Sequence, residues 1–502
     1  MRRKGKPKNT TLQNFLEPRT STYVSRTCHK PNRPTASQNF LEPRTSTCLD
    51  MPQAKSTDSF VQYLQAKTSI HYGYFIIVAA TIGKIFSAPG QSPCIGVVIE
   101  SIEKAYHLSS TTVSTIYMAS TVTSAICLPF TGPIIQQMGV QKAMGIIVCG
   151  LSFSCILLTL FVNPISLYIA FFGLRFFGQG LIMSTSIMTI NLWWVKQRGR
   201  MMGVAGAITS GFMLGVVPLI MMALIDNLNW RTCYFWLACA TFCFMFPVGT
   251  LFYRDKPENI GLFPDAKWDF SLDENQLEED NFTQDKKNED EDEIECGELD
   301  IRQILLSPTF IFFSLADFAT AATNTALFFH MSMIFSTESP STIQNIYPVM
   351  ASLGIVGKLV GGYLSDRMGA KFVSVEGLTL MCLGFASIPW VAEKNLSVFL
   401  PIFLIGVGGA FTHTCRSIVY AIFFGRANQP KIQPIATSIT VLGSAFGPLP
   451  FSIVFDSTNS YNFACYAAAV VLGVSGILVW LFCKKKNLRT TEKIELKPMN
   501  TI

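Results

Sequence analysis

The chain has few charged residues for its length. Asp, Glu, Lys and Arg make up 14 % of its 502 residues, against about a quarter in an average globular protein. Hydrophobic residues make up 49 % of the chain, and 40 residues are Phe. So little charge over so long a sequence excludes an ordinary water-soluble domain and indicates a protein that crosses a membrane several times.

Motifs of enzymes and metal sites are also missing. The sequence contains no GxxxxGK[ST], HExxH or GxSxG motif, and no CxxC pair or Cys/His cluster with metal-ligand spacing. We therefore predict that the chain is not an enzyme and holds no metal or cofactor. Most of the 14 Cys residues lie in apolar stretches, where they act as small hydrophobic side chains; examples are Cys127, Cys149, Cys155, Cys239 and Cys243.

Long apolar stretches recur from Tyr72 to Cys483. A bilayer core about 30 Å thick needs about 20 apolar residues per helix, and twelve stretches reach this length. We predict an all-α membrane protein with twelve transmembrane helices, the first of which directs insertion because no signal peptide precedes it. The predicted spans are 72–102, 111–135, 142–163, 165–192, 201–225, 232–253, 305–335, 342–364, 372–392, 396–424, 433–456 and 461–483.

The distribution of Lys and Arg predicts the orientation in the membrane, because cytosolic loops are rich in both. The odd-numbered loops hold Lys104, Arg231 and Lys394. The even-numbered loops hold more, namely Lys142, Lys196, Arg198, Arg200, Arg367, Lys371, Arg426 and Lys431. We expect a multi-pass protein of the plasma membrane with both termini in the cytosol. The net charge of +6 then reflects topology, and we expect no nucleic-acid partner.

Polar segments divide the chain into domains. QNFLEPRTST occurs at 13–22 and again at 38–47, and two copies cannot build a repeat core, so we predict either a plain disordered tail or a paired docking motif. Residues 271–300 hold 14 of the 33 acidic residues, which is typical of a solvated connector. The predicted domains are a disordered cytosolic tail (1–70), a six-helix bundle (71–253), an acidic cytosolic linker (254–303), a second six-helix bundle (304–483) and a basic cytosolic tail (484–502).

The two predicted bundles share a sequence pattern. GPIIQQMGVQK follows the second span and GGYLSDRMGAK follows the eighth, so that Gly132 and Gly139 correspond to Gly362 and Gly369 with a shift of 230 residues. GFMLG in the fifth span and GSAFG in the eleventh correspond with a shift of 232 residues. The pattern indicates two parallel repeats of six helices each.

GGYLSDRMGAK resembles the signature that the major facilitator superfamily carries after the second helix of each half. This resemblance implies two bundles that rock around a site at the middle of the membrane. It also implies that Asp366, Arg367 and the four glycines above form a gate at the cytosolic end. Lys358 is predicted to be a gate or anchor residue. The first-half copy has Gln136 and Gln137 in place of the charges, so its contact would be uncharged.

Further motifs resemble the branch of monocarboxylate porters and oxalate/formate antiporters over residues 72–483. They are SAPGQSPCIGVVIESIEKAYHLSSTTVS, NLWWVKQRGRMMG, RDKPENIGLFPD and FFGRANQPKIQPIATSITVLGSAFGPLPFSIVFDSTNSY. The resemblance implies a small organic anion as substrate, moved by proton symport or anion exchange. Proton-coupled porters of this branch have an Asp-x-x-x-Arg pair in the eighth span. This chain has Gly354 and Lys358 at the two positions, so the pair is absent. Some relatives require a single-span accessory protein, and the sequence leaves open whether this chain does.

Charged residues within the apolar spans point to a binding site, because each costs at least a few kcal/mol unless it faces a cavity or a partner. On the first, fourth, seventh and tenth spans, a charged residue shares a helix face with other polar residues. These four helices line the central cavity in the superfamily. The groups are Lys84, Ser87 and Gln91; Arg175 and Gln179; Asp317, Thr320 and Asn324; and His413, Arg416 and Tyr420.

We predict that Lys84, Arg175 and Arg416 bind a carboxylate and that Asp317 moderates one of them between turnovers. Alternatively, Asp317 pairs permanently with a Lys or Arg and only joins helices. The break that Pro89 introduces near Gln91 is either a substrate contact, a hinge or a kink without function. The full predicted substrate-binding set is Lys84, Gln91, Arg175, Gln179, Asp317, Asn324, His413 and Arg416.

Two other functions fit the sequence. A membrane sensor could bind such an anion without transporting it and signal through the tail with the duplicated segment. A transporter could also carry neutral or amphipathic solutes, which the 12 % aromatic content would suit.

Overall fold

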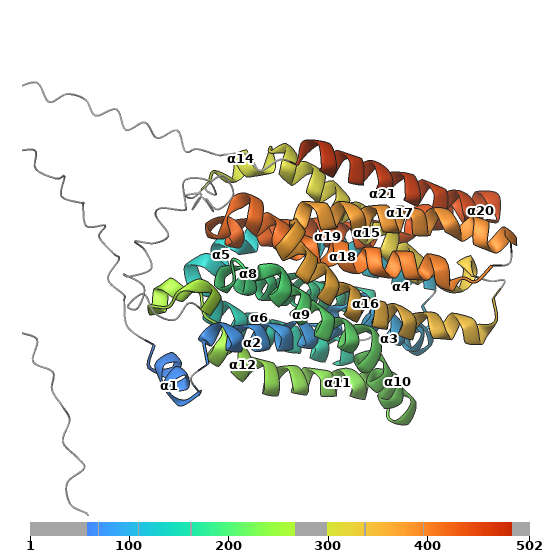
Figure 1. The fold of residues 1–502 in the computed structure, drawn as a ribbon. Coiled ribbons are helices and arrows are strands. Elements are labelled where there is room, and N and C mark those ends of the chain that lie inside the picture. The colour runs from blue at the N-terminus through green and yellow to red at the C-terminus, as the bar shows by residue number, and fades with distance from the viewer. Residues whose placement is uncertain are drawn as a thin grey trace, which may run out of the picture. The chain divides into compact units, whose positions relative to one another are not determined.

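The computed structural model describes residues 58–68, 70–108, 110–160, 163–266, 299–335, 338–394 and 396–483. These residues form helices joined by turns, and none of them belongs to a β-strand, so the predicted all-α membrane fold is confirmed (Figure 1). Both copies of QNFLEPRTST, most of the predicted acidic linker and the basic tail lie outside the described residues.

Eleven helical stretches among the described residues are long and apolar enough to cross a membrane. They correspond to the second to twelfth predicted spans. In the first half they comprise α4 (Ser110–Cys127) with α5 (Thr131–Met138), α6 (Val140–Leu160), α7 (Pro164–Gly173) with η3 (Leu174–Ile182) and α8 (Met183–Trp193), α9 (Arg198–Gly211) with α10 (Val217–Asn227), and α11 (Trp230–Ala240) with α12 (Phe246–Phe252).

The second half repeats this arrangement with longer uninterrupted helices. A short helix, α14 (Ile301–Leu305), leads into it. The spans that follow are α15 (Pro308–Ile334), α16 (Pro340–Met368), α17 (Ala370–Lys394), α18 (Phe399–Phe424), α19 (Gln429–Phe446) with α20 (Pro448–Thr458), and α21 (Asn462–Phe482).

The first predicted span is broken near its middle. It consists of α2 (Tyr72–Phe86), the 3-10 turn η1 (Ala88–Gly90) and α3 (Ser92–Tyr106). Pro89 cannot donate a backbone hydrogen bond, so the α-helical ladder stops there and restarts at Ser92. With this broken span, the two halves have six spans each.

Residues 59–68 differ from the prediction. They belong to the tail that we expected to be disordered as far as residue 70, but Ser59–Thr68 forms the helix α1. Asp58 explains the difference: its Oδ1 accepts a hydrogen bond from the Phe60 amide, and its Oδ2 lies 2.6 Å from Nε of Arg254. The Phe60 ring also packs edge-on against Phe252, with 5.8 Å between ring centroids. These contacts anchor α1 at the end of the bundle where α2 begins.

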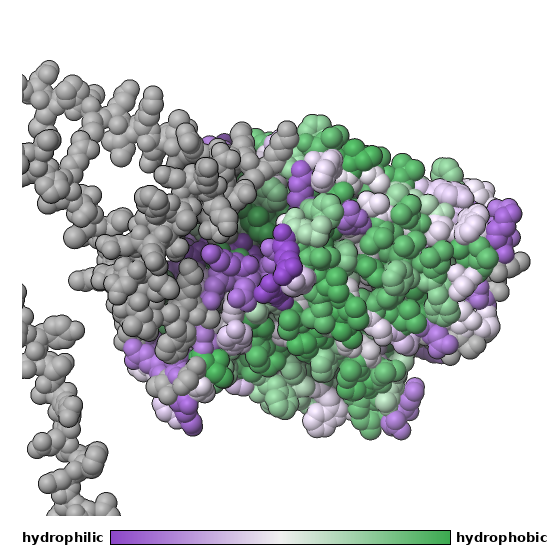
Figure 2. Space-filling model, viewed as in Figure 1, coloured by the Kyte–Doolittle hydropathy of each residue, from purple (hydrophilic) through white to green (hydrophobic). Residues whose placement is uncertain are grey.

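Two clusters of buried apolar side chains hold the bundle together. One is built mainly from the first half, and the other lies entirely within residues 299–483. The outward-facing side chains are also largely apolar, and Figure 2 shows such residues over most of the visible flank of the helices. An apolar flank of this extent fits a protein surrounded by lipid, because a soluble protein exposes much smaller apolar patches.

Candidate substrate cavity

A cavity of about 290 Å³ lies between the two halves. Its lining comes from the first, fourth, seventh and tenth spans, and also from the eleventh. Among the described residues that line it, none is Asp or Glu. They are Gln91, Ser92, Pro93, Gln179, Met183, Ile187, Ala321, Asn324, Thr325, Phe328, His413, Arg416, Ser417, Gln433, Ala436, Thr437, Thr440, Val441 and Ser444.

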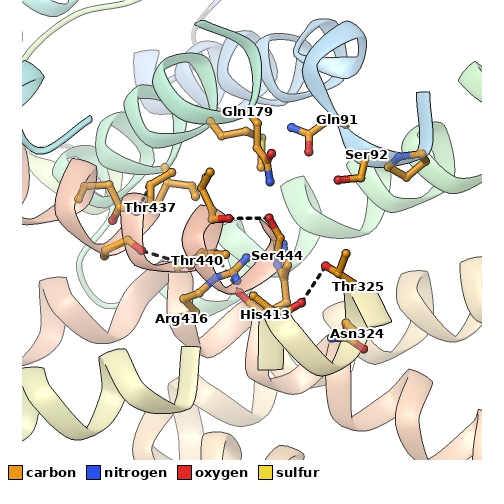
Figure 3. A pocket seen from close by; sticks show the side chains of 18 of the residues that line it. Gln91, Ser92, Gln179, Asn324, Thr325, His413, Arg416, Thr437, Thr440 and Ser444 are labelled. Carbon is orange, nitrogen blue, oxygen red and sulfur yellow. Dashed lines mark hydrogen bonds between the residues drawn. The ribbon is translucent and has the colours of Figure 1, made fainter. Parts of the chain in front are cut away.

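Five predicted binding residues line this cavity. They are Gln91, Gln179, Asn324, His413 and Arg416 (Figure 3). The other three predicted residues, which carry charges, do not belong to its lining. Helical spacing grouped lining and non-lining residues on the same predicted faces, so it did not predict how deep each side chain lies.

Arg416 on α18 supplies the fixed positive charge of the cavity. Its side chain is partly exposed, and no hydrogen bond or ion pair engages its guanidinium within the described part of the chain. His413 lies one turn earlier on the same helix and also reaches the cavity (Figure 3). A guanidinium has five N–H donors, and at Arg416 all of them are available for a ligand.

Arg175 lies behind the cavity wall and is almost completely buried, with 1 % of its surface exposed. Its Nη1 donates to the Gly90 carbonyl at 3.1 Å and to Ser92 Oγ at 3.2 Å, and its Nη2 donates to Ser444 Oγ at 3.2 Å. The guanidinium also lies over the Tyr117 ring, 5.2 Å from its centroid. In this conformation Arg175 thus holds the broken first span and contacts the second half. Its role as a carboxylate ligand stays a prediction.

Asp317 on α15 accepts a hydrogen bond of 2.7 Å from the hydroxyl of Tyr420 on α18. Both side chains are buried. No ion pair engages Asp317 within the described residues, so the permanent pairing considered as an alternative does not occur in this conformation. The Arg416 charge nevertheless lies within electrostatic range of the carboxyl group.

Two further cations, Lys84 and Lys358, are buried and do not belong to the cavity lining. Nζ of Lys84 has no hydrogen-bond partner among the described residues, and the residue is 1 % exposed. Nζ of Lys358 on α16 donates to Ser210 Oγ on α9 at 2.6 Å, which joins the two halves. Lys84 and Arg416 both lie within electrostatic range of Lys358. The region between the halves therefore has more positive than negative groups.

The two halves are in contact at the end of the bundle where α2 begins and α21 ends, which we call the tail end (left in Figure 1). There Asp366 accepts hydrogen bonds from the Gly199 amide at 2.7 Å and the Arg200 amide at 2.8 Å, at the start of α9. Its Oδ2 also lies 3.8 Å from Nε of Arg200. Arg367 does not pair with Asp366 but lies over the Tyr363 ring, 4.8 Å from its centroid.

Corresponding glycines bring the helices together at the tail end. A Cβ atom at Gly362 would collide with the Gly199 carbonyl oxygen, and one at Gly132 would collide with the Pro430 carbonyl oxygen. Each contact joins one half to the other. Gly139 and Gly369 end α5 and α16 with φ angles of +82° and +88°, which side chains disfavour. That these residues gate access stays a prediction.

Other contacts at the tail end were missed by reasoning from the sequence. Arg426 forms an ion pair with Glu258, and Nδ2 of Asn191 donates to the Ser417 carbonyl at 2.7 Å. Both contacts also join the two halves. The even-numbered loops showed that Arg426 lies at this end, but no local pattern indicated its partner.

A family model described as Major Facilitator Superfamily matches residues 74–415 and 309–501, which together cover most of the chain. The chain belongs to the major facilitator superfamily. The cavity lies between the two halves of this superfamily member.

One similar protein is "Probable anion transporter 4, chloroplastic" of Arabidopsis thaliana, which is 28 % identical over 131 residues. The matched stretch covers 25 % of this chain and 24 % of that protein. The transporter thus spans about a quarter of the length of the curated relative.

Solved structures of superfamily members are similar over most of the chain. The human organic anion transporter MFSD10 (TETRAN) is 15 % identical, with a TM-score of 0.58 over 81 % of this chain and 99 % of its own. The proton:xylose symporter XylE bound to 6-bromo-6-deoxy-D-glucose is 13 % identical, with a TM-score of 0.63 over 82 % of this chain and 96 % of its own. At these identities the likeness shows the shared fold.

Proposed function

We propose that this superfamily member transports a small organic anion by alternating access, with the Arg416 guanidinium holding the carboxylate of the substrate. The observation that carries the proposal is the unpaired Arg416 in a cavity that no Asp or Glu lines within the described residues. A guanidinium binds a carboxylate through two parallel hydrogen bonds, and a cavity without carboxylates does not compete for it. The similarity to a probable anion transporter and to an organic anion transporter agrees with this charge.

The remaining predicted residues fit supporting roles in this mechanism. Gln91, Gln179, Asn324 and His413 contact the substrate, whereas Lys84, Arg175 and Asp317 act from behind the cavity wall. The contacts of Asp366, Gly132 and Gly362 close the tail end, which faces the cytosol of a cell that carries the protein in its plasma membrane. When these contacts separate, the substrate leaves on that side.

Uptake by proteoliposomes tests the proposed role of Arg416. The panel contains labelled lactate, pyruvate, formate, oxalate and a neutral amino acid. Arg416→Gln should raise KM for the accepted anion by about 10- to 150-fold, since a hydrogen bond to a charged group contributes about 1.5–3 kcal/mol. Arg416→Lys should retain part of the affinity, because the charge remains while the planar fork is lost.

Lys142→Gln is the matched control, because this exposed cation lies at the start of α6, outside the cavity lining. It should leave KM unchanged. Uptake of anions that is equal in Arg416→Gln and in the unmodified protein would contradict the proposal. The same assay separates the two proposed modes of coupling: stimulation by an inward proton gradient indicates symport, whereas stimulation by an internal anion alone indicates exchange.

A further inference from the structure

The polar groups of the cavity lining indicate which groups the ligand has besides its carboxylate. Besides Arg416 and His413, the lining contains the carboxamides of Gln91, Gln179, Asn324 and Gln433, together with six Ser or Thr hydroxyl groups. A simple carboxylate such as acetate would satisfy Arg416 and leave most of these groups unused. The inference drawn here rests on the proposed function and concerns the same site.

The hydroxyl groups of the lining present mainly acceptor atoms to the cavity, because their hydrogens are already used within their own helices. Thr325 donates to the Ala321 carbonyl at 2.8 Å, and Ser444 donates to the Val441 carbonyl at 2.8 Å. Ser417 and Thr440 also donate to the carbonyls four residues earlier. Each such oxygen can still accept a hydrogen bond, but it has no hydrogen left to donate.

The carboxamides add further acceptors on both sides of the cavity. Oε1 of Gln179 in the first half and Oε1 of Gln433 in the second half are buried and have no hydrogen-bond partner among the described residues. Nε2 of Gln91 donates to Ser87 Oγ at 3.0 Å, which leaves its oxygen available. Figure 3 shows Gln91 and Gln179 on the opposite side of the view from Arg416 and His413.

The ligand must therefore supply hydrogen-bond donors as well as a negative group. An ammonium group would supply donors, but no carboxylate in the described lining would balance its charge next to Arg416. Hydroxyl groups supply donors without charge. We propose that the cavity selects a compact carboxylic acid that carries two or more hydroxyl groups, which donate to Gln179 on one side and to Gln433 on the other.

Propionate, lactate and glycerate test this proposal, because they share a three-carbon skeleton and have no, one and two hydroxyl groups. Uptake is measured with the full chain in proteoliposomes. We expect kcat/KM to rise by about 5- to 150-fold for each hydroxyl group that is added from propionate to lactate to glycerate, the range that corresponds to pairing one buried polar group. Gln179→Met and Gln433→Met should each lower the ratio of kcat/KM between glycerate and propionate, because each change raises KM for glycerate more than KM for propionate.

Thermal unfolding of each purified variant shows whether the protein is folded. Gln303→Met is the control, since Gln303 is exposed on α14 and lies outside the cavity lining. Equal kcat/KM values for the three acids would overturn the selection of hydroxyl groups and leave the proposed anion transport intact. A glycerate preference that survives in both carboxamide variants would overturn the assignment to Gln179 and Gln433. Failure to take up any carboxylate would refute the proposed function and this inference with it.

Discussion

Asp366→Asn should weaken the contact between the halves at the tail end. The Asp366 carboxylate lies at the beginning of α9, where it accepts from the Gly199 amide at 2.7 Å and from the Arg200 amide at 2.8 Å. Asparagine retains one acceptor oxygen, so one of these hydrogen bonds persists without charge and the other is lost. The favourable interaction of a negative charge with the helix N-terminus is lost as well.

The magnitude follows from the number and kind of contacts. A hydrogen bond to a charged group contributes about 1.5–3 kcal/mol, which is about 10- to 150-fold in an equilibrium constant. The Arg200 ion pair adds little, because the Arg200 side chain is 44 % exposed and water screens its charge. We therefore expect the open state of the tail end to gain about 10- to 150-fold in population.

Hydrogen–deuterium exchange of the purified protein measures this change. The Gly199 and Arg200 amides should exchange faster in Asp366→Asn by the same factor. Asp255→Asn is the matched control, because the Asp255 carboxylate accepts from the Val140 amide at 2.8 Å within the first half. This variant should accelerate exchange at Val140 alone. Unchanged exchange at Gly199 and Arg200 in Asp366→Asn, with the expected effect in the control, would refute the reasoning.

Two further predictions concern charges at other depths. Lys84→Met should raise the free energy of unfolding by about 1–4 kcal/mol in thermal unfolding, because it removes a buried ammonium that has no partner among the described residues. The same change should lower anion uptake. A lower stability would contradict the first part. Burial raises the pKa of Asp58, but the hydrogen bond and charge of Arg254 outweigh it and hold that pKa below its usual 3.8. A carboxyl group with a lowered pKa stabilises the fold above its unfolded-state pKa and loses this contribution as the pH falls through the folded value. Exchange of the α1 amides should therefore be constant near neutral pH, once corrected for intrinsic rates, and should accelerate below about pH 4; Asp58→Asn should abolish that dependence.

Features that depend on neighbouring residues could be predicted from the sequence. Apolar length, which is a local property, predicted the spans. The repeated motif predicted that Gly132 and Gly362 hold corresponding positions in the two halves. The eleventh span was overlooked as part of the cavity. Its polar residues Gln433, Thr437 and Ser444 recur at helical spacing, and this stripe could have been recognised in the sequence. The prediction considered only charged residues and the four helices that the resemblance implied, so it missed this stripe.

Depth and pairing could not be predicted, because they depend on residues far apart in the chain. The stripes placed Lys84 and Asp317 on inward faces, but only the packed bundle shows that both lie behind the cavity wall. The helix α1 is a similar case. Its anchor is the ion pair between Asp58 and Arg254, two residues separated by 196 positions in the sequence.

The broken first span and the buried Arg175 explain one another. Pro89 and Gly90 interrupt the ladder of α2, which frees the buried Gly90 carbonyl, and Arg175 supplies the donor that this carbonyl needs. The same guanidinium donates to Ser444, whose hydroxyl hydrogen is already used on Val441, so Ser444 Oγ can only accept. Moving the second half away would break this hydrogen bond of a charged group, at a net cost of about 1.5–3 kcal/mol. The break in the first span is thereby coupled to the position of the second half, and a ligand oxygen that replaced Ser444 Oγ as acceptor would remove that cost and favour separation of the halves.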